Sequence, residues 1–166
     1  NKTREHYVSF LVKSAKYLLN NGFKPFILIH EYNTDYQIGL DIQRKLEAEI
    51  EIVQEKDPLV IKGIINNCLF VIGSRFHGLV SSLSQGIPCI ATGWSHKYNE
   101  LFTDYGVSEF LVSDLSSDTI LEDRLNKLCD KTKRRSVKET LKINGEKQRQ
   151  IVQKMWDEVF SVINKE

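Results

Sequence analysis

The side chains best placed to do chemistry lie in the segment GSRFHG, from Gly73 to Gly78. Four apolar residues precede it and a helical pattern follows, which predicts a turn between a buried strand and a helix. Backbone N–H groups at the start of a helix attract anions. Arg75 adds a planar guanidinium that suits phosphate or carboxylate, and His77 can donate a hydrogen bond or move a proton near neutral pH. We therefore predict an anion site at this turn, with Ser74 as the helix cap and the two glycines leaving room for close backbone approach.

The same turn also has a purely structural interpretation. Arg75 could pair with a carboxylate at the edge of the sheet, and His77 could only cap the helix. The pattern alone does not decide between the two. For Arg75 and His77 to share a ligand, Arg75 has to lie in the non-helical turn, because helical residues two apart point to nearly opposite sides.

Two other segments follow predicted strands and could contribute to a site. His30 comes at the end of the first strand, where it either lines the site or is satisfied within the sheet edge. Lys97 follows the fourth strand, where it either meets an anion or is solvated. No pair of histidines has the spacing of metal ligands, and no G-x-G-x-x-G or P-loop follows any strand, so we predict no metal and no cofactor.

Strand and helix patterns alternate along the chain. Short apolar runs predict strands at FILIH, IEIV, LFVIG, PCIAT and EFLVS, which are residues 26–30, 50–53, 69–73, 88–92 and 109–113. Gly22, Gly86 and Gly106 mark helix ends, Asp57 with Pro58 marks a helix start, and a further helix is predicted over 37–49. Apolar strands separated by helices predict strands buried on both faces. We predict the α/β class: a Rossmann-like, doubly wound parallel sheet of about five strands with helices on both faces.

The composition of the chain bears on the number of domains, on nucleic-acid and membrane contact, and on the cellular compartment. The 166 residues predict one domain, 1–166. A net charge of +1 gives no support for nucleic-acid binding. No apolar run is long enough to span a bilayer, so any membrane contact would be peripheral. Cys68, Cys89 and Cys129 are far apart in apolar patterns and predict reduced core thiols, which indicates a cytoplasmic protein.

The segment CLFVIGSRFHGLVSSLSQGIPCIATGWSHKYNELFTDYG carries a resemblance to a known family. An apolar strand leads into Gly-Ser-Arg-aromatic-His-Gly, an amphipathic helix, Gly-Ile-Pro, a strand, a loop with lysine and a helix ending near Asp-Tyr-Gly. In this order the segment resembles the carboxyl-terminal half of polysaccharide pyruvyltransferases. The resemblance is strong over residues 57–107 and extends more weakly over 24–56.

The resemblance implies a function. Family members transfer a pyruvyl group from phosphoenolpyruvate to a sugar of a cell-surface polysaccharide or its lipid-linked precursor, forming a pyruvate ketal. The resemblance assigns Arg75 and His77 to the phosphoenolpyruvate site as binding and catalytic residues, and it assigns Lys97 to the same site less directly. With the rest of the turn and His30, the predicted substrate-binding residues are Ser74, Arg75, Phe76, His77, Gly78, Lys97 and His30.

The resemblance also implies an architecture. Family members resemble the two-domain GT-B glycosyltransferases, with the ligand between two Rossmann-like domains. This chain has the length of one domain and begins with Asn1 rather than Met, so we expect it to be the carboxyl-terminal, donor-binding half, with the amino-terminal domain as a missing partner. On its own this half could be inactive.

Two helices are predicted at the end of the chain, around 117–131 and 134–164, the second within the carboxyl-terminal segment 134–166. The basic run 131–138 predicts a solvated helix start rather than an anion site. The last helix has an apolar stripe that includes Trp156, Val159 and Phe160. We expect this stripe to pack on the domain itself; the alternative is that it covers the missing domain.

Two other functions fit the same fold. One is the nucleotide-sugar half of a GT-B glycosyltransferase or of a UDP-sugar 2-epimerase. Those domains more often carry a glutamate near the helix before Gly-x-Pro, and here that helix reads LVSSLSQ with no carboxylate. The other is a non-catalytic, Rossmann-like interaction module, because a fold does not fix a function.

Overall fold

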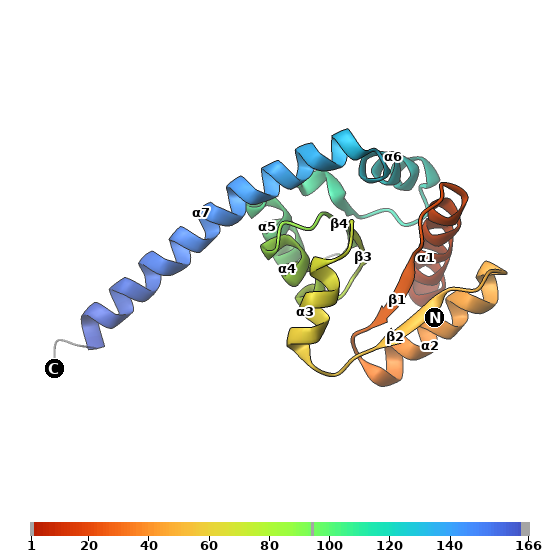
Figure 1. The fold of residues 1–166 in the computed structure, drawn as a ribbon, viewed down its shortest axis with the longest axis horizontal. Coiled ribbons are helices and arrows are strands. Elements are labelled where there is room, and N and C mark those ends of the chain that lie inside the picture. The colour runs from red at the N-terminus through yellow and green to blue at the C-terminus, as the bar shows by residue number, and fades with distance from the viewer. Residues whose placement is uncertain (1, 94, 164–166) are drawn as a thin grey trace.

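Helices and strands alternate along the residues that the computed structural model describes, 2–93 and 95–163 (Figure 1). The elements are α1 (Lys2–Asn20), β1 (Phe26–Ile29), α2 (Tyr32–Leu46), β2 (Glu51–Gln54), α3 (Pro58–Asn66), β3 (Val71–Gly73), α4 (Phe76–Ser84), β4 (Cys89–Thr92), α5 (His96–Asp104), the 3₁₀ turn η1 (Ser108–Phe110), β5 (Leu111–Val112), α6 (Asp118–Cys129) and α7 (Lys131–Ile163). Every predicted strand has a counterpart, so the α/β class is confirmed.

The five described strands form two parallel sheets, whereas one continuous sheet was predicted. β1 pairs with β2, with Phe26 opposite Glu51, and β3, β4 and β5 form the second sheet, with Val71 opposite Cys89. No hydrogen-bonded ladder joins β1 to β3 within the described residues. The prediction of a single five-stranded sheet is therefore wrong. Local patterns identify strands, but a ladder forms only where two backbones approach to about 4.8 Å, and a cleft separates β1 from β3.

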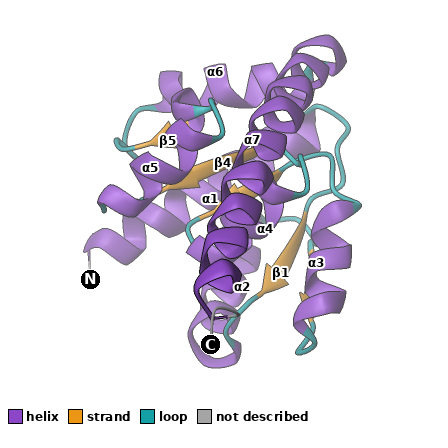
Figure 2. Cartoon of the chain, turned by 90° about the vertical axis from the view of Figure 1, so that its left-hand side faces the viewer, coloured by secondary structure: helices purple, strands orange, loops and turns teal. Residues whose placement is uncertain are grey.

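The strands are buried to different degrees because the two sheets are separate. All four residues of β4 are buried, because this strand is central in its sheet. In Figures 1 and 2, α4, α5 and α7 lie on one side of that sheet and α1 on the other. β1, β2 and β3 are only partly buried. The expectation of strands buried on both faces therefore holds for β4 alone.

The ends of several helices follow the predicted signals. Gly22, Gly86 and Gly106 all adopt positive φ values, 78°, 73° and 69°, which glycine adopts without strain. Asp57 accepts a hydrogen bond from the backbone N–H of Leu59 at 2.8 Å at the start of α3. α2 differs from its prediction: it begins at Tyr32 and ends at Leu46, because Glu47 leaves the helix with a φ of 55°.

Helix α1 joins two hydrophobic clusters. Phe10 and Leu18 pack into the larger cluster, around β4, α4, α5 and α6. On another face of α1, Val8 and Val12 pack against Ile42 and Leu46 of α2. Because α1 contributes to both clusters, it couples the β1–β2 unit to the β3–β4–β5 unit without a continuous sheet.

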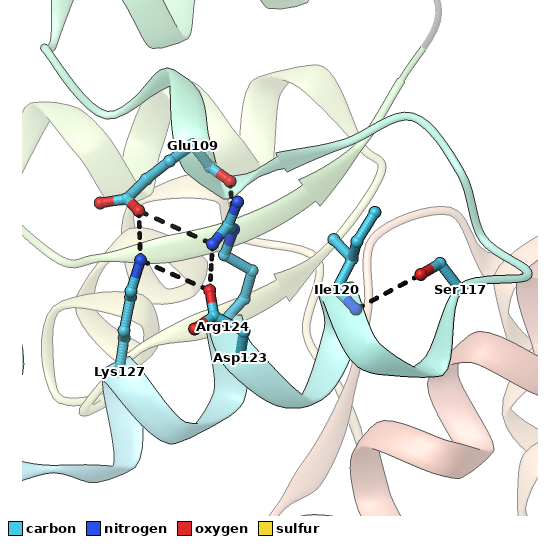
Figure 3. A network of polar contacts seen from close by, with 6 residues as sticks. All are labelled: Glu109, Ser117, Ile120, Asp123, Arg124 and Lys127. Carbon is cyan, nitrogen blue, oxygen red and sulfur yellow. Dashed lines mark hydrogen bonds and ion pairs between the residues drawn. The ribbon is translucent and has the colours of Figure 1, made fainter.

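A polar network fastens α6 to η1 (Figure 3). The Arg124 Nε donates to the Glu109 carbonyl at 2.5 Å, and the Lys127 Nζ pairs with the Glu109 carboxylate at 2.7 Å. Asp123 pairs with both cations, while Ser117 accepts a hydrogen bond from the backbone N–H of Ile120 at the helix start. The carboxylates of Glu109 and Asp123 are about half exposed, so the network lies at the surface of the domain.

α7 packs on the domain only through its first half. Leu141 and Gly145 are its buried residues, and the Asn144 Nδ2 donates to the Tyr105 carbonyl at 3.1 Å. The basic start of the helix is solvated as predicted, apart from Arg134, which donates to the carbonyls of Leu128 and Cys129 at the end of α6.

The second half of α7 extends away from the domain (Figure 1). Its apolar stripe is exposed: Ile151, Val152, Met155, Trp156, Val159, Phe160, Val162 and Ile163. The prediction that the stripe packs on this domain is therefore wrong. Amphipathicity shows which face of a helix is apolar, but it does not identify the surface that buries this face. Among the described residues, no helix is both long and apolar enough to cross a membrane.

Candidate active site

The segments that follow β1 and β3 line one cleft of about 1370 Å³. Its walls include β1 and β3 and the facing side chains of α1 and α3. The lining includes all of β1 and β3 but no residue of β2, so β2 pairs with β1, and β4 with β3, on the side away from the cleft. Open α/β sheets bind ligands where the strand order reverses in this way. The cleft is lined by all seven of the predicted substrate-binding residues: His30, Ser74, Arg75, Phe76, His77, Gly78 and Lys97.

The turn after β3 places Arg75 outside the helix. Arg75 is the N-cap residue of α4, with extended φ and ψ of −73° and 112°. His77 lies in the first turn of the helix, so the two side chains meet the geometric condition for reaching a common ligand. Ser74 does not cap α4, contrary to prediction. The helix begins one residue later than a Ser74 cap requires, which gives the cap position to Arg75, and no side chain caps the helix.

The guanidinium of Arg75 is held by two carboxylates of α2 and its N-cap. Its Nε and Nη2 both donate to Asp35, with the shortest contact at 2.6 Å, and Nη2 also pairs with Glu31 at 2.5 Å. The hydrogen bond to Asp35 is the main cause that raises the pKa of Arg75. The structural interpretation is thus confirmed for Arg75. It fails for His77, whose side chain neither caps α4 nor makes a hydrogen bond to any described residue.

Aromatic rings set the positions of His77 and Lys97. The ring of Phe76 lies edge-on to His77 at 6.2 Å and to Tyr98 at 5.4 Å between centroids. The Nζ of Lys97 lies 4.6 Å from the Phe76 centroid and 5.5 Å from that of Tyr98, within the range of a cation–π contact. Lys97 is exposed and has no carboxylate partner among the described residues, so its charge stays available to a ligand in the cleft.

Three residues of the site carried no sequence prediction. Asp35 is the main partner of Arg75. The Tyr98 hydroxyl donates to the Ser74 carbonyl at 2.8 Å, which ties α5 to the turn. Tyr7 of α1 lies near Ser74, Asp35 and Arg75, and its burial raises the pKa of its phenol. The one available signal was Asp35, an acid in the first turn of a helix that follows a strand; the tyrosines are brought to the turn by tertiary packing alone.

A comparison with known families bears on this cleft. The family described as polysaccharide pyruvyl transferase matches residues 1–96, more than half of the chain. The chain belongs to the polysaccharide pyruvyl transferase family. This confirms the resemblance drawn from the sequence, and the match covers all of the cleft residues up to and including the turn. No curated protein and no solved structure matches the chain significantly.

The residues that match the polysaccharide pyruvyl transferase family can be located on the fold. The match spans both sides of the cleft, from α1 through β4 to His96. Arg75, His77 and both carboxylate partners of Arg75 lie inside it. Lys97 and Tyr98 come directly after it, and α6 and α7 lie wholly beyond it. Within the described residues no group of three or more His, Cys, Asp or Glu side chains is arranged to hold a metal ion.

Proposed function

We propose that this domain binds phosphoenolpyruvate in the cleft and transfers its pyruvyl group to a sugar hydroxyl of a polysaccharide or its lipid-linked precursor. The observation that carries the proposal is the convergence of Arg75, His77 and Lys97 on one cleft in a chain of this family. Phosphoenolpyruvate carries a phosphate and a carboxylate, and two cations with an imidazole suit this pair of anions.

The proposed transfer forms two bonds from sugar oxygens to C2 of phosphoenolpyruvate and breaks the bond from C2 to the phosphate oxygen. A sugar hydroxyl oxygen bonds to C2 of phosphoenolpyruvate and gives up its proton, while the methylene carbon C3 takes up one proton and the C2–C3 double bond becomes single. The bond from C2 to the phosphate oxygen then breaks, and a second hydroxyl of the sugar bonds to C2. This completes the ketal, and the proton of the second hydroxyl leaves with the released phosphate. Arg75 binds the phosphate and stabilises the charge that grows on it as it leaves. His77 either donates a hydrogen bond to the phosphate or protonates C3.

Removing the guanidinium tests this assignment. Arg75→Ala is expected to weaken phosphoenolpyruvate binding by about tenfold or more, because hydrogen bonds to charged groups contribute about 1.5–3 kcal/mol. Isothermal titration calorimetry measures this directly. Arg44→Ala is the matched control, since Arg44 is an exposed arginine of α2 that pairs with Asp41 away from the cleft. Equal affinities for wild type and Arg75→Ala would contradict the proposal, and tight binding of UDP with no response to phosphoenolpyruvate would favour a nucleotide-sugar site.

We propose further that residues 1–166 are the donor-binding half of a two-domain enzyme of the GT-B kind, and that the other domain covers the stripe of α7. The support is the exposure of the stripe: Trp156 is 48% exposed and Phe160 53% exposed, and their rings stack at 5.7 Å. Trp156→Asp is expected to leave the stability of residues 1–166 nearly unchanged and to destabilise a longer chain that contains the other domain. An equal effect in both chains would contradict this part of the proposal.

We also propose that the protein acts in the cytoplasm. All three cysteines are free thiols, and Cys89 is fully buried. Burial raises the pKa of the Cys89 thiol far above its ordinary value, so this residue packs as a small apolar group. Unpaired cysteines are typical of a reducing compartment. Fractionation of cells producing a tagged chain tests this; recovery of the chain outside the cytoplasmic fraction would contradict it.

A further inference from the structure

The guanidinium of Arg75 has one side occupied and one side available. An arginine carries five N–H donors. The Nε–H and the two N–H groups of Nη2 face Asp35 and Glu31. Nη1 makes no hydrogen bond to any described residue, and the Arg75 side chain is 45% exposed. The ion pairs therefore fix the direction of the guanidinium while leaving two donors for an anion in the cleft.

The two carboxylates that hold Arg75 differ in how firmly they are placed. The Asp35 side chain is 16% exposed, and it also accepts a hydrogen bond from the backbone N–H of Glu31 at 2.9 Å. The Glu31 side chain is 58% exposed, makes a single contact with the guanidinium, and forms no helix cap. Asp35 is thus held by α2 and by Arg75 together, whereas Glu31 can swing into solvent.

We propose that Asp35 is the positioning residue that aims Arg75 into the cleft, and that Glu31 is an exchangeable partner that an incoming anion displaces. This inference rests on the function proposed above. Asp35 binds the guanidinium side-on through Nε and Nη2, the geometry that fixes the plane of an arginine. Glu31 shares Nη2 from an exposed position, so its negative charge opposes a phosphate that approaches the same guanidinium.

A matched pair of variants separates positioning from simple charge. Asp35→Asn and Glu31→Gln each remove one negative charge beside Arg75 and preserve side-chain size. If the carboxylates only repelled the ligand, both variants would bind phosphoenolpyruvate more tightly. The proposal instead predicts opposite signs. Asp35→Asn is expected to raise the dissociation constant about tenfold, as the loss of a charged hydrogen bond does. Glu31→Gln is expected to lower it about two- to fivefold, the scale of an exposed charge interaction.

The affinities are measured by calorimetry on the full chain, with phosphoenolpyruvate and with inorganic phosphate. Tighter binding in both variants, or unchanged binding in Asp35→Asn, would overturn the positioning role. Weaker binding in Glu31→Gln would overturn its role as an exchangeable partner. If Asp35→Asn does not fold, Arg75→Lys replaces it. This variant keeps the charge but cannot pair side-on, and retained affinity there would overturn the proposal.

A second measurement reports on Arg75 without any ligand. In a ¹⁵N-labelled chain, the Nε–H signal of Arg75 is expected to be visible and slow to exchange in wild type and Glu31→Gln, and to be lost in Asp35→Asn. Arg75→Lys identifies the signal by its absence. If wild type binds neither phosphoenolpyruvate nor phosphate, the proposed function and the role of Glu31 both fail. The Nε–H signal still decides whether Asp35 orients Arg75, and an unchanged signal in Asp35→Asn would refute that.

Discussion

Gly93 is the position at which one added methyl group should disturb the site. A Cβ built at Gly93 lies 2.6 Å from two atoms of the Tyr98 ring, and ordinary contact begins at about 3.4 Å. In Gly93→Ala the ring therefore has to move by roughly 0.8 Å, which strains the hydrogen bond from its hydroxyl to the Ser74 carbonyl, 2.8 Å long in the native structure. Overpacking costs about 1–3 kcal/mol and the hydrogen bond about 1 kcal/mol. We expect the free energy of unfolding to fall by about 2–4 kcal/mol.

Urea denaturation followed by circular dichroism measures this loss. Gly63→Ala is the control, because Gly63 lies inside α3 with open space where its Cβ would be, and alanine there should stabilise the helix by up to about 1 kcal/mol. Tyr98→Phe removes only the hydrogen bond. The double variant should cost less than the sum of the single ones, since both act on the same contact. Wild-type stability in Gly93→Ala, or strict additivity with Tyr98→Phe, would refute the reasoning.

Three further predictions concern how the domain is held together. Gly106→Ala should destabilise more than Gly22→Ala. Both glycines have positive φ values, but at Gly106 an added Cβ would also lie 2.6 Å from the Asn144 Nδ2, which donates to the Tyr105 carbonyl at 3.1 Å. Overpacking costs about 1–3 kcal/mol, and equal urea midpoints would contradict this. Leu141→Ala should cost about 2–5 kcal/mol, because Leu141 is the buried anchor of α7, whereas the same change at the exposed Ile143 should cost little in the same assay. Burial raises the pKa of Tyr7 above its ordinary value of 10.0, so the neutral phenol stabilises the fold below pH 10 and this contribution is lost as the pH rises further. Tyr7→Phe should therefore show a shallower loss of stability between pH 9 and 11, and an unchanged slope would count against the burial of this phenol.

Local features of the fold were predictable because their causes lie within a few residues. The left-handed conformation at Gly86 and Gly106 follows from the absence of a Cβ just where an apolar helical pattern ends. The start of α3 follows from an aspartate followed by proline. The end of α2 was misplaced because a glutamate, Glu47, adopts the conformation that glycine usually takes, and no local signal marks such a position.

Features that depend on distant partners were not predictable in the same way. The residues of β1 and β3 identify both strands, but nothing in either segment states whether their backbones meet, and here they line a cleft instead. The burial of the apolar stripe of α7 is equally hard to predict from the sequence. Its period shows that one face is apolar, while the exposure of Trp156 and Phe160 depends on which other surfaces are within reach.

At the site, the two sequence interpretations of Arg75 were posed as alternatives, and the geometry removes the conflict between them. A guanidinium that pairs side-on with Asp35 uses Nε and Nη2 and keeps the donors of Nη1. A structural ion pair and an anion site can therefore share one arginine. The pairing even favours binding, because a side chain that is already oriented loses less conformational entropy when a ligand arrives. A carboxylate near a predicted anion site therefore does not rule the site out, provided that it leaves one edge of the guanidinium free, as Asp35 leaves Nη1.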